Sequence, residues 1–191
     1  MGERAYTVFD TVVGRCAIAW GVAGIVGVQL AEAREIETRR HLLRRFPDAR
    51  ETRPTPEIEA AIDGLKALLR GEPADLSDVA LDMADVLPFA RRAYQLVRTI
   101  PRGETLTFAD IASRLGASGA VLSVGQALAK NPFALLVPCH RVLPARGETS
   151  GTLACGGIVS RYRLLSIEGA LTGRGPTLLD ALSFAPPRST G

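Results

Sequence analysis

Short apolar runs separated by glycines fill the first third of the chain. Segments rich in Val, Ile and Thr span 6–12, 15–20 and 24–30, and Gly14, Gly21 and Gly24 lie at the breaks between them. Runs of residues that favour β-structure, bounded by glycine, predict strands. Because the connections are short, the strands are expected to pair as an antiparallel meander.

Apolar residues then change to helical spacing. A pattern over 32–46 carries a stripe of arginines, which we interpret as a solvated face. Thr55-Pro56-Glu57 has the capping hydroxyl and first-turn proline of a helix start, and that helix is predicted to end at Gly71. Further helical patterns occupy 89–100, 107–116, 120–128 and 156–169. The two in the middle are joined by a glycine-containing turn, which is typical of a helix-turn-helix.

A polar, irregular stretch from 71 to 87 divides these patterns and is typical of a linker. We therefore expect an N-terminal α/β domain (1–84), a mainly helical domain (85–170) and a C-terminal tail (171–191). The predicted fold class is α/β, with an N-terminal antiparallel sheet flanked by helices and a mainly helical C-terminal domain containing the helix-turn-helix.

Composition argues against a membrane protein, a disulfide-rich protein and a zinc protein, but it does not identify a function. The 191 residues are 47% apolar and 23% charged, as in an ordinary globular protein. No apolar run approaches the length of a membrane span or a signal peptide, so a cytoplasmic protein without membrane contact is expected. Three irregularly spaced cysteines indicate neither a disulfide framework nor a zinc site, and no metal or cofactor is predicted. The net charge of +3 is compatible with nucleic-acid binding but does not establish it.

The segment Pro138-Cys139-His140-Arg141-Val142 is the strongest candidate for chemistry. A thiol becomes a good nucleophile when a nearby base or positive charge favours the thiolate. His140 and Arg141 are of the right types, but sequence neighbours need not meet in space. An inert buried cysteine beside an ordinary histidine is the alternative.

The wider pattern around this segment resembles the alkylguanine-DNA alkyltransferase family over residues 85 to 170. The matching motifs, in order, are Pro101-Arg102-Gly103-Glu104-Thr105, Asn131-Pro132, Pro138 to Val142, Gly156-Gly157 and Leu164-Leu165-Ser166-Ile167-Glu168-Gly169. The resemblance implies a self-consuming repair protein. Such a protein flips an alkylated guanine out of duplex DNA and transfers the alkyl group to a cysteine.

Roles for individual residues follow from the same resemblance. Cys139 is implied as the acceptor, with His140 as its base through a water. Glu168 is implied to orient and charge-balance the histidine, and Asn131 to brace the turn. The resemblance places the substrate pocket at Phe108, Pro138, Arg141, Val142, Ala154, Cys155, Gly156 and Gly157.

Three positions depart from the family's usual pattern. Leu122 stands where the family has an arginine that enters the duplex, and with Ser123 and Gly125 it lies in a helix that lacks charge from 119 to 129. Phe108 replaces a tyrosine that meets a phosphate. Weak DNA binding is therefore expected. Cys155, just before the paired glycines, is expected to lie close to Cys139. Two interpretations of it stay open: it resolves a labile group on Cys139, or it merely takes the place of a small serine or alanine.

Three functional hypotheses follow. The first is single-turnover repair by a monomer whose partner is duplex DNA with alkylated guanine. The second is a relative that accepts an alkyl or nitroso group from a small-molecule donor through Cys139, with Cys155 assisting. The third is a non-catalytic helix-turn-helix binder, which the retained nucleophile disfavours.

Overall fold

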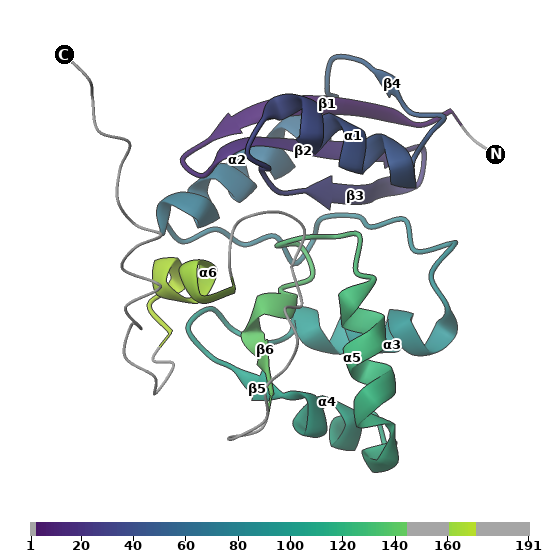
Figure 1. Ribbon diagram of the computed structural model, residues 1–191, viewed down its shortest axis with the longest axis vertical. Helices are drawn as coiled ribbons and strands as arrows, with labels where there is room; N and C mark the ends of the chain where they lie inside the picture. The colour runs from purple at the N-terminus through teal and green to yellow at the C-terminus, as the bar shows by residue number, and fades with distance from the viewer. Residues whose placement is uncertain (1–2, 145–160, 171–191) are drawn as a thin grey trace.

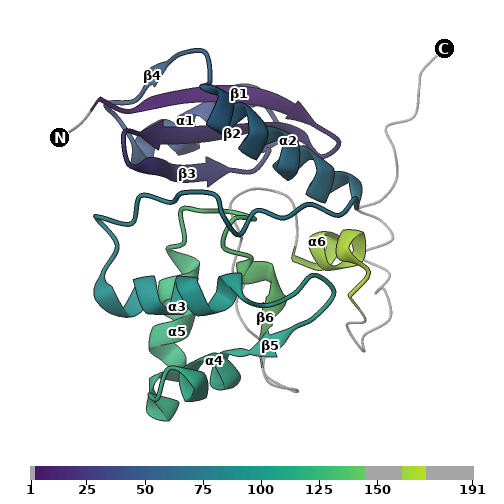
Figure 2. The same ribbon diagram turned by 180° about the vertical axis from the view of Figure 1, so that it is seen from behind.

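A sheet with a helix on each face lies above a cluster of helices in the computed structural model, which describes residues 3–144 and 161–170 (Figures 1 and 2). The sheet contains β1 (Ala5–Thr11), β2 (Gly14–Gly21), β3 (Gly24–Gln29) and β4 (Arg50–Glu51) in the order β3-β2-β1-β4. The predicted antiparallel meander is confirmed for β1 to β3. The two-residue β4 pairs parallel with β1 and is too short to leave a pattern in the sequence.

The alternation of side chains along β2 explains why both faces of the sheet are covered. Ala17 and Ala19 pack with residues of α1 (Glu35–Arg45), whereas Ile18 belongs to the main core together with Leu65 of α2 (Pro56–Arg70). Successive strand residues point to opposite faces, so each helix receives one set. Small side chains on the α1 side allow that helix to approach closely. A Cβ on Gly27 would lie 2.5 Å from the ring of Phe46.

The outer edge of β3 carries the predicted linker. Ile25 donates its amide to the carbonyl of Ala80 (2.9 Å), and Asp82 donates back to Ile25 (2.8 Å). Further along, the amide of Val28 donates to the carbonyl of Pro132 (2.7 Å). These bonds pair backbone N–H and C=O groups of β3 that would otherwise be left open at the edge of the sheet. They also tie the sheet to the segment that leads to Cys139.

The helical part contains α3 (Pro88–Arg98), α4 (Phe108–Arg114), α5 (Val121–Ala129) and α6 (Arg161–Glu168), with the short parallel strands β5 (Leu106–Thr107) and β6 (Val142–Leu143). Thr107 caps α4 at the start of the helical pattern predicted over 107–116. Its Oγ1 accepts from the amide of Asp110 (3.0 Å), and its own amide donates to the Asp110 carboxylate (2.7 Å). A single 3-10 turn, η1 (Ser118–Ala120), joins α4 to α5. The two helices predicted around this turn are therefore present.

One hydrophobic core connects the sheet to the helical part. It contains Ile18 and Leu65 from the upper layers, Val97 and Phe133 from the lower ones, and Leu164 of α6. Arg45 at the end of α1 also crosses the junction, because it donates to the carbonyl of Lys130 (2.7 Å). Its side chain is nonetheless exposed, as the solvated face predicted for this helix requires. Within 3–144 and 161–170, no helix is long and apolar enough to span a membrane.

Candidate active site

The turn that presents Cys139 is held by short-range hydrogen bonds. The amide of Val137 donates to the carbonyl of Phe133 (2.8 Å), which closes the apolar run back on itself. Asn131 braces the same turn from both sides: its Nδ2 donates to the carbonyl of Val137 (2.9 Å), and its Oδ1 accepts from the amide of Phe133 (2.9 Å). Cys139 then opens the 3-10 turn η2 (Cys139–Arg141) and is buried.

Backbone strain lies inside this turn. Leu135 has φ +67°, the one positive φ among the described non-glycine residues. The left-handed conformation costs an ordinary residue about 1–2 kcal/mol, so packing must maintain it. Leu135 is itself buried, and the neighbouring Phe133 meets Tyr94 of α3 edge-on at 6.2 Å between ring centres. The core thus holds the cysteine turn in a fixed shape.

His140 and Glu168 form a buried pair although they are far apart in sequence. His140 Nε2 lies 2.8 Å from Glu168 Oε1, and the two side chains are 1% and 5% exposed. The contact brings η2 against the end of α6. Nδ1 of His140 is buried and has no hydrogen-bond partner among the described residues.

Arg141 holds the other side of Glu168. Its Nε donates to Oε2 (2.9 Å) and its Nη2 to Oε1 (2.8 Å), while Nη1 donates to the carbonyl of Ile100 (2.6 Å). A guanidinium fork of this kind fixes a carboxylate in orientation as well as in charge. The resemblance placed Arg141 in the substrate pocket, but these contacts put its guanidinium behind the histidine–carboxylate pair.

The electrostatics of this pair define which atoms carry protons. Burial raises the pKa of Glu168, but hydrogen bonds from His140 and Arg141 outweigh it and lower that pKa to about 2. Burial lowers the pKa of His140, against the opposing effect of Glu168. At neutral pH the pair is therefore a carboxylate and a neutral imidazole. Because a carboxylate can only accept, Nε2 carries the hydrogen and Nδ1 carries the lone pair.

Arg161 is a residue of this site that the motifs did not indicate. It is the first residue of α6, its Nε is buried without a hydrogen-bond partner in the described part of the chain, and its charge contributes to lowering the pKa of His140. No sequence signal links an arginine at 161 to a histidine at 140, since only the packing of α6 on η2 brings them near.

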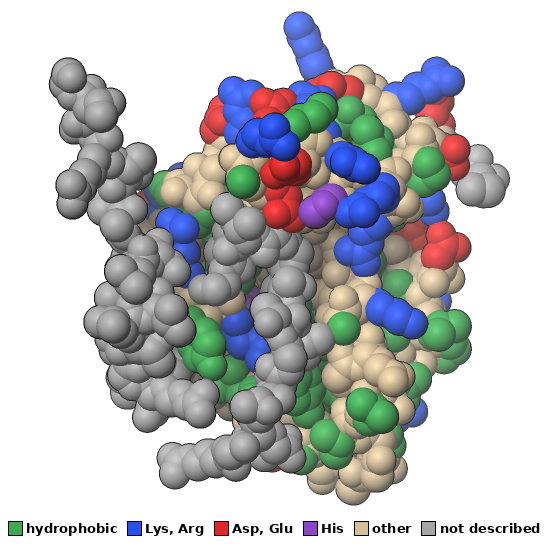
Figure 3. All heavy atoms as spheres, viewed as in Figure 1, with side chains coloured by type: hydrophobic (Ala, Val, Ile, Leu, Met, Phe, Trp, Pro, Cys, Tyr) green, Lys and Arg blue, Asp and Glu red, His purple; other side chains and the backbone are tan. Residues whose placement is uncertain are grey.

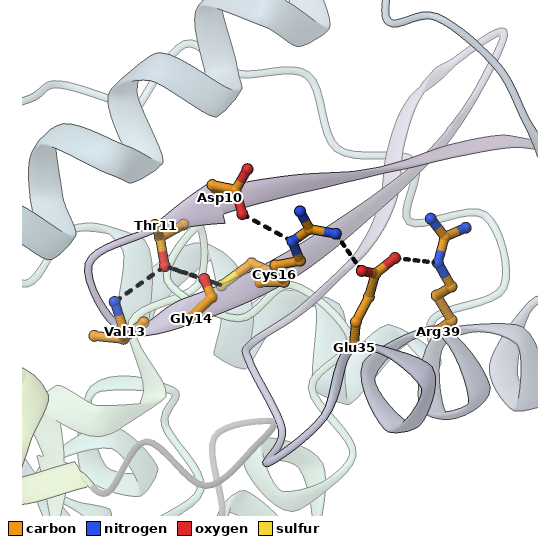
Figure 4. A network of polar contacts seen from close by, with 8 residues as sticks. Asp10, Thr11, Val13, Gly14, Cys16, Glu35 and Arg39 are labelled. Atoms are coloured by element: carbon orange, nitrogen blue, oxygen red, sulfur yellow. Dashed lines mark hydrogen bonds and ion pairs between the residues drawn. The ribbon is translucent and has the colours of Figure 1, made fainter. Parts of the chain in front are cut away.

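Cys16 offers an internal comparison with Cys139. It lies in β2, where its Sγ is 3.6 Å from Thr11 Oγ1, beside a chain of surface ion pairs through Glu35 (Figure 4). Burial raises the pKa of the Cys16 thiol, and the Thr11 hydroxyl offsets this in part. Its polar neighbours are a hydroxyl and backbone carbonyls rather than a base. Cys16 is therefore a core residue and not a second nucleophile.

The remaining predicted pocket residues divide into two groups. Phe108, Pro138 and Val142 are buried on α4, beside Cys139 and in β6 respectively. Ala154, Cys155, Gly156 and Gly157 lie outside the described residues, and so does the predicted proximity of Cys155 to Cys139. Among the described residues, no group of three or more His, Cys, Asp or Glu is placed to hold a metal ion.

The exposed face of α5 is poor in charge. Leu122 is 74% exposed, Ser123 is exposed, and a Cβ on Gly125 would meet no atom within 4 Å. Figure 3 shows mainly hydrophobic and uncharged side chains over α4 and α5, whereas Lys, Arg, Asp and Glu gather over α1. Leu122, at the start of α5, therefore does not contribute to the core.

Comparisons with known proteins identify relatives of this chain. Residues 88–170 match the family model described as 6-O-methylguanine DNA methyltransferase, DNA binding domain. A methylated-DNA–protein-cysteine methyltransferase of Methanothermobacter thermautotrophicus is 32% identical over 80% of this chain and 78% of its own. One from Mycobacterium bovis is 36% identical over 79% and 91%. A structure of Mycobacterium tuberculosis OGT in complex with DNA has 30% identity and a TM-score of 0.67, covering 86% of this chain and 92% of that chain.

Proposed function

The chain belongs to the methylated-DNA–protein-cysteine methyltransferase family, and we propose that it repairs alkylated guanine in duplex DNA by transferring the alkyl group to Cys139. The observation that carries this proposal is the buried relay beside the thiol. It consists of a carboxylate, a neutral imidazole with its lone pair on Nδ1, and a braced turn that begins with the cysteine. An inert core cysteine such as Cys16 has no such relay.

The relay has a defined direction of proton movement. Glu168 accepts from His140 Nε2, which leaves Nδ1 as the base. We assign Nδ1 to take the thiol proton of Cys139 through one water. The imidazolium formed in this step is stabilised by the carboxylate that already contacts it. Arg141 keeps that carboxylate ionised and in position.

Alkyl transfer then balances without a cofactor. The thiolate sulfur forms a bond to the alkyl carbon, the bond from that carbon to guanine O6 breaks, and its electron pair goes to the oxygen. The proton held at His140 returns to the guanine. The product is a thioether, which water does not cleave under mild conditions, so each protein molecule acts once.

Access to the thiol requires the base to leave the duplex. Cys139 is 4% exposed, and a base stacked in a helix cannot reach a buried atom. We place α5 against the DNA with Leu122 as an apolar wedge that parts the stack, since apolar side chains serve this purpose in other DNA-binding proteins. A charge-poor helix gives few phosphate contacts, so the affinity for undamaged DNA is expected to be low, with a shallow salt dependence. We propose that a single protein molecule acts on each lesion.

One observation favours a second candidate function. The lack of charge on α5 equally suits a relative that accepts an alkyl or nitroso group from a small molecule, with the same relay activating Cys139. The non-catalytic binder receives no comparable support, because a buried base beside the cysteine has no purpose in a protein that only binds.

Incubation with three donors separates these functions. The protein is mixed in turn with duplex containing O6-methylguanine, with the free methylated base, and with a low-molecular-weight nitroso donor, and intact mass is recorded. Repair predicts rapid addition of one methyl group from the duplex and slow or no reaction with the others. Faster reaction with a small donor would support the second function, and no adduct from any donor would refute both.

A further inference from the structure

A cavity lies beside the cysteine turn, bordered by Leu135, Leu136 and Pro138. Its volume is about 480 Å³, and its walls come from the linker that follows α2, from the end of α3 and from the cysteine turn itself. The polar side chains that line it include Arg98, Arg102, Thr99 and Ser77, and the apolar ones include Leu68, Leu76, Ile100, Leu135 and Leu136. Arg141 and Pro138 border this space, but Cys139, His140 and Glu168 do not line it, and neither does any residue of α5.

Two arginines that line this cavity each use a single nitrogen, Nη2, to donate hydrogen bonds to backbone carbonyls. Arg98 Nη2 donates to the carbonyls of Leu76 (3.1 Å), Ser77 (2.5 Å) and Val79 (3.1 Å). Arg102 Nη2 donates to the carbonyls of Gly71 (2.5 Å) and Ile167 (3.1 Å). In the described part of the chain, Nε and Nη1 of both arginines lack a protein partner, and neither atom is sealed from solvent. Each guanidinium therefore keeps donors available.

The positive charge of these arginines is also uncompensated. Among the described residues, no carboxylate lies within ion-pair distance of Arg98 or Arg102, and Asp78 influences Arg98 only at longer range. The third arginine of the wall, Arg141, is already neutralised by Glu168. Asp75 is the one carboxylate among the described lining residues. Two partly desolvated cations without a counter-charge favour an anionic ligand.

We propose that this cavity binds a small molecule bearing a phosphate group, with the phosphate between Arg98 and Arg102. Guanidinium forks match the geometry of phosphate oxygens, and two positive charges match a phosphate dianion. The apolar floor formed by Leu68, Leu76 and Leu136 suits a ring attached to the phosphate, and the volume is in the range of small-ligand sites. A mononucleotide has both parts.

Calorimetric titration with inorganic phosphate and with guanosine monophosphate tests the site. We expect wild type to bind, and Arg98→Gln and Arg102→Gln to bind at least about tenfold more weakly, since each loses a charge-assisted contact worth about 1.4 kcal/mol or more. Arg40→Gln is the matched control, because Arg40 is exposed on α1, far from the cavity, with no hydrogen bond or ion pair among the described residues. Tighter binding of the nucleotide than of phosphate assigns the apolar floor to the base, and equal binding assigns the site to phosphate alone.

Thr99→Glu tests the charge argument if an arginine variant fails to fold. Thr99 is exposed, and its hydroxyl bonds within its own helix end to the carbonyl of Leu96 (2.8 Å), so the fold should tolerate the change. A carboxylate at this wall is expected to abolish phosphate binding. Absence of binding to wild type, or affinities in Thr99→Glu and the folded arginine variants that equal those of Arg40→Gln, would overturn the proposal.

Discussion

Replacing Glu168 with glutamine should lower both the stability of the fold and the reactivity of the Cys139 thiol. The carboxylate is buried between His140 and Arg141, and hydrogen bonds from both lower its pKa from 4.5 to about 2. Each tenfold change in proton affinity is worth about 1.4 kcal/mol, so ionised Glu168 contributes about 3 kcal/mol to stability. The glutamine side chain cannot ionise and turns an amide donor toward the guanidinium. We expect the free energy of unfolding at pH 7 to fall by about 3 kcal/mol.

Urea unfolding across pH provides the assay. The pKa of Glu168 is lower in the folded state than in the unfolded state, so its contribution is complete above about pH 4.5 and is lost as pH falls toward 2. The difference in free energy of unfolding between wild type and Glu168→Gln should therefore shrink as pH falls from about 4.5 toward 2. Glu104→Gln, at an exposed carboxylate, is the control and should match wild type.

Thiol labelling measures the second consequence of the same substitution. With an alkylating reagent at pH 7, the rate at Cys139 should fall about ten- to a hundredfold, because His140 loses the charge that stabilises its protonated form. Cys16 in the same sample gives the baseline. A loss of stability below about 1 kcal/mol together with an unchanged labelling rate would refute the relay.

Three further substitutions test other parts of the structure. Asn131→Ala removes both bonds that brace the cysteine turn and should cost about 1–3 kcal/mol in urea unfolding; wild-type stability would contradict the bracing role. Gly27→Ala places a methyl group 2.5 Å from the ring of Phe46 and should lower the free energy of unfolding by about 1–3 kcal/mol. Gly125→Ala lies in open space on α5 and should raise it by about 0.5–1 kcal/mol. Equal effects of the two substitutions in thermal melts would refute the packing argument. Leu122→Arg should raise the affinity for duplex DNA and steepen the salt dependence of binding by about one phosphate contact. Val22 is 99% exposed on the β2–β3 turn, and Val22→Arg should raise the affinity less. Equal effects of the two substitutions in fluorescence anisotropy would remove α5 from the DNA interface.

Local patterns in the sequence were sufficient for most secondary structure. The glycine-bounded β-runs predicted β1 to β3, and the helical pattern from Thr107 predicted the start of α4. Both signals depend only on neighbouring residues. The two-residue β4 was not predicted, since its pairing with β1 depends on the return of the chain after α1. The linker was predicted as polar and irregular, but its docking along β3 uses backbone groups that no side-chain pattern reports.

The site was predictable as a set of residue types but not as a geometry. The motif and the resemblance named His140, Glu168 and Asn131, yet the tautomer of the histidine follows only from its contact with a carboxylate on another helix. The resemblance placed Arg141 in the substrate pocket, whereas its contact with Glu168 depends on the packing of α6, which no local pattern reports. Arg161 was missed for the same reason. Long-range packing, rather than sequence proximity, decides which polar groups meet.

The most direct test of the central claim is the stoichiometry and location of methyl transfer from a duplex containing O6-methylguanine. Wild type and Cys16→Ser are expected to gain one methyl group per protein molecule, found by peptide mapping on Cys139, and then to stop reacting. Cys139→Ser is expected to gain none. Transfer that continues beyond one equivalent, or a methyl group that persists in Cys139→Ser, would contradict the account.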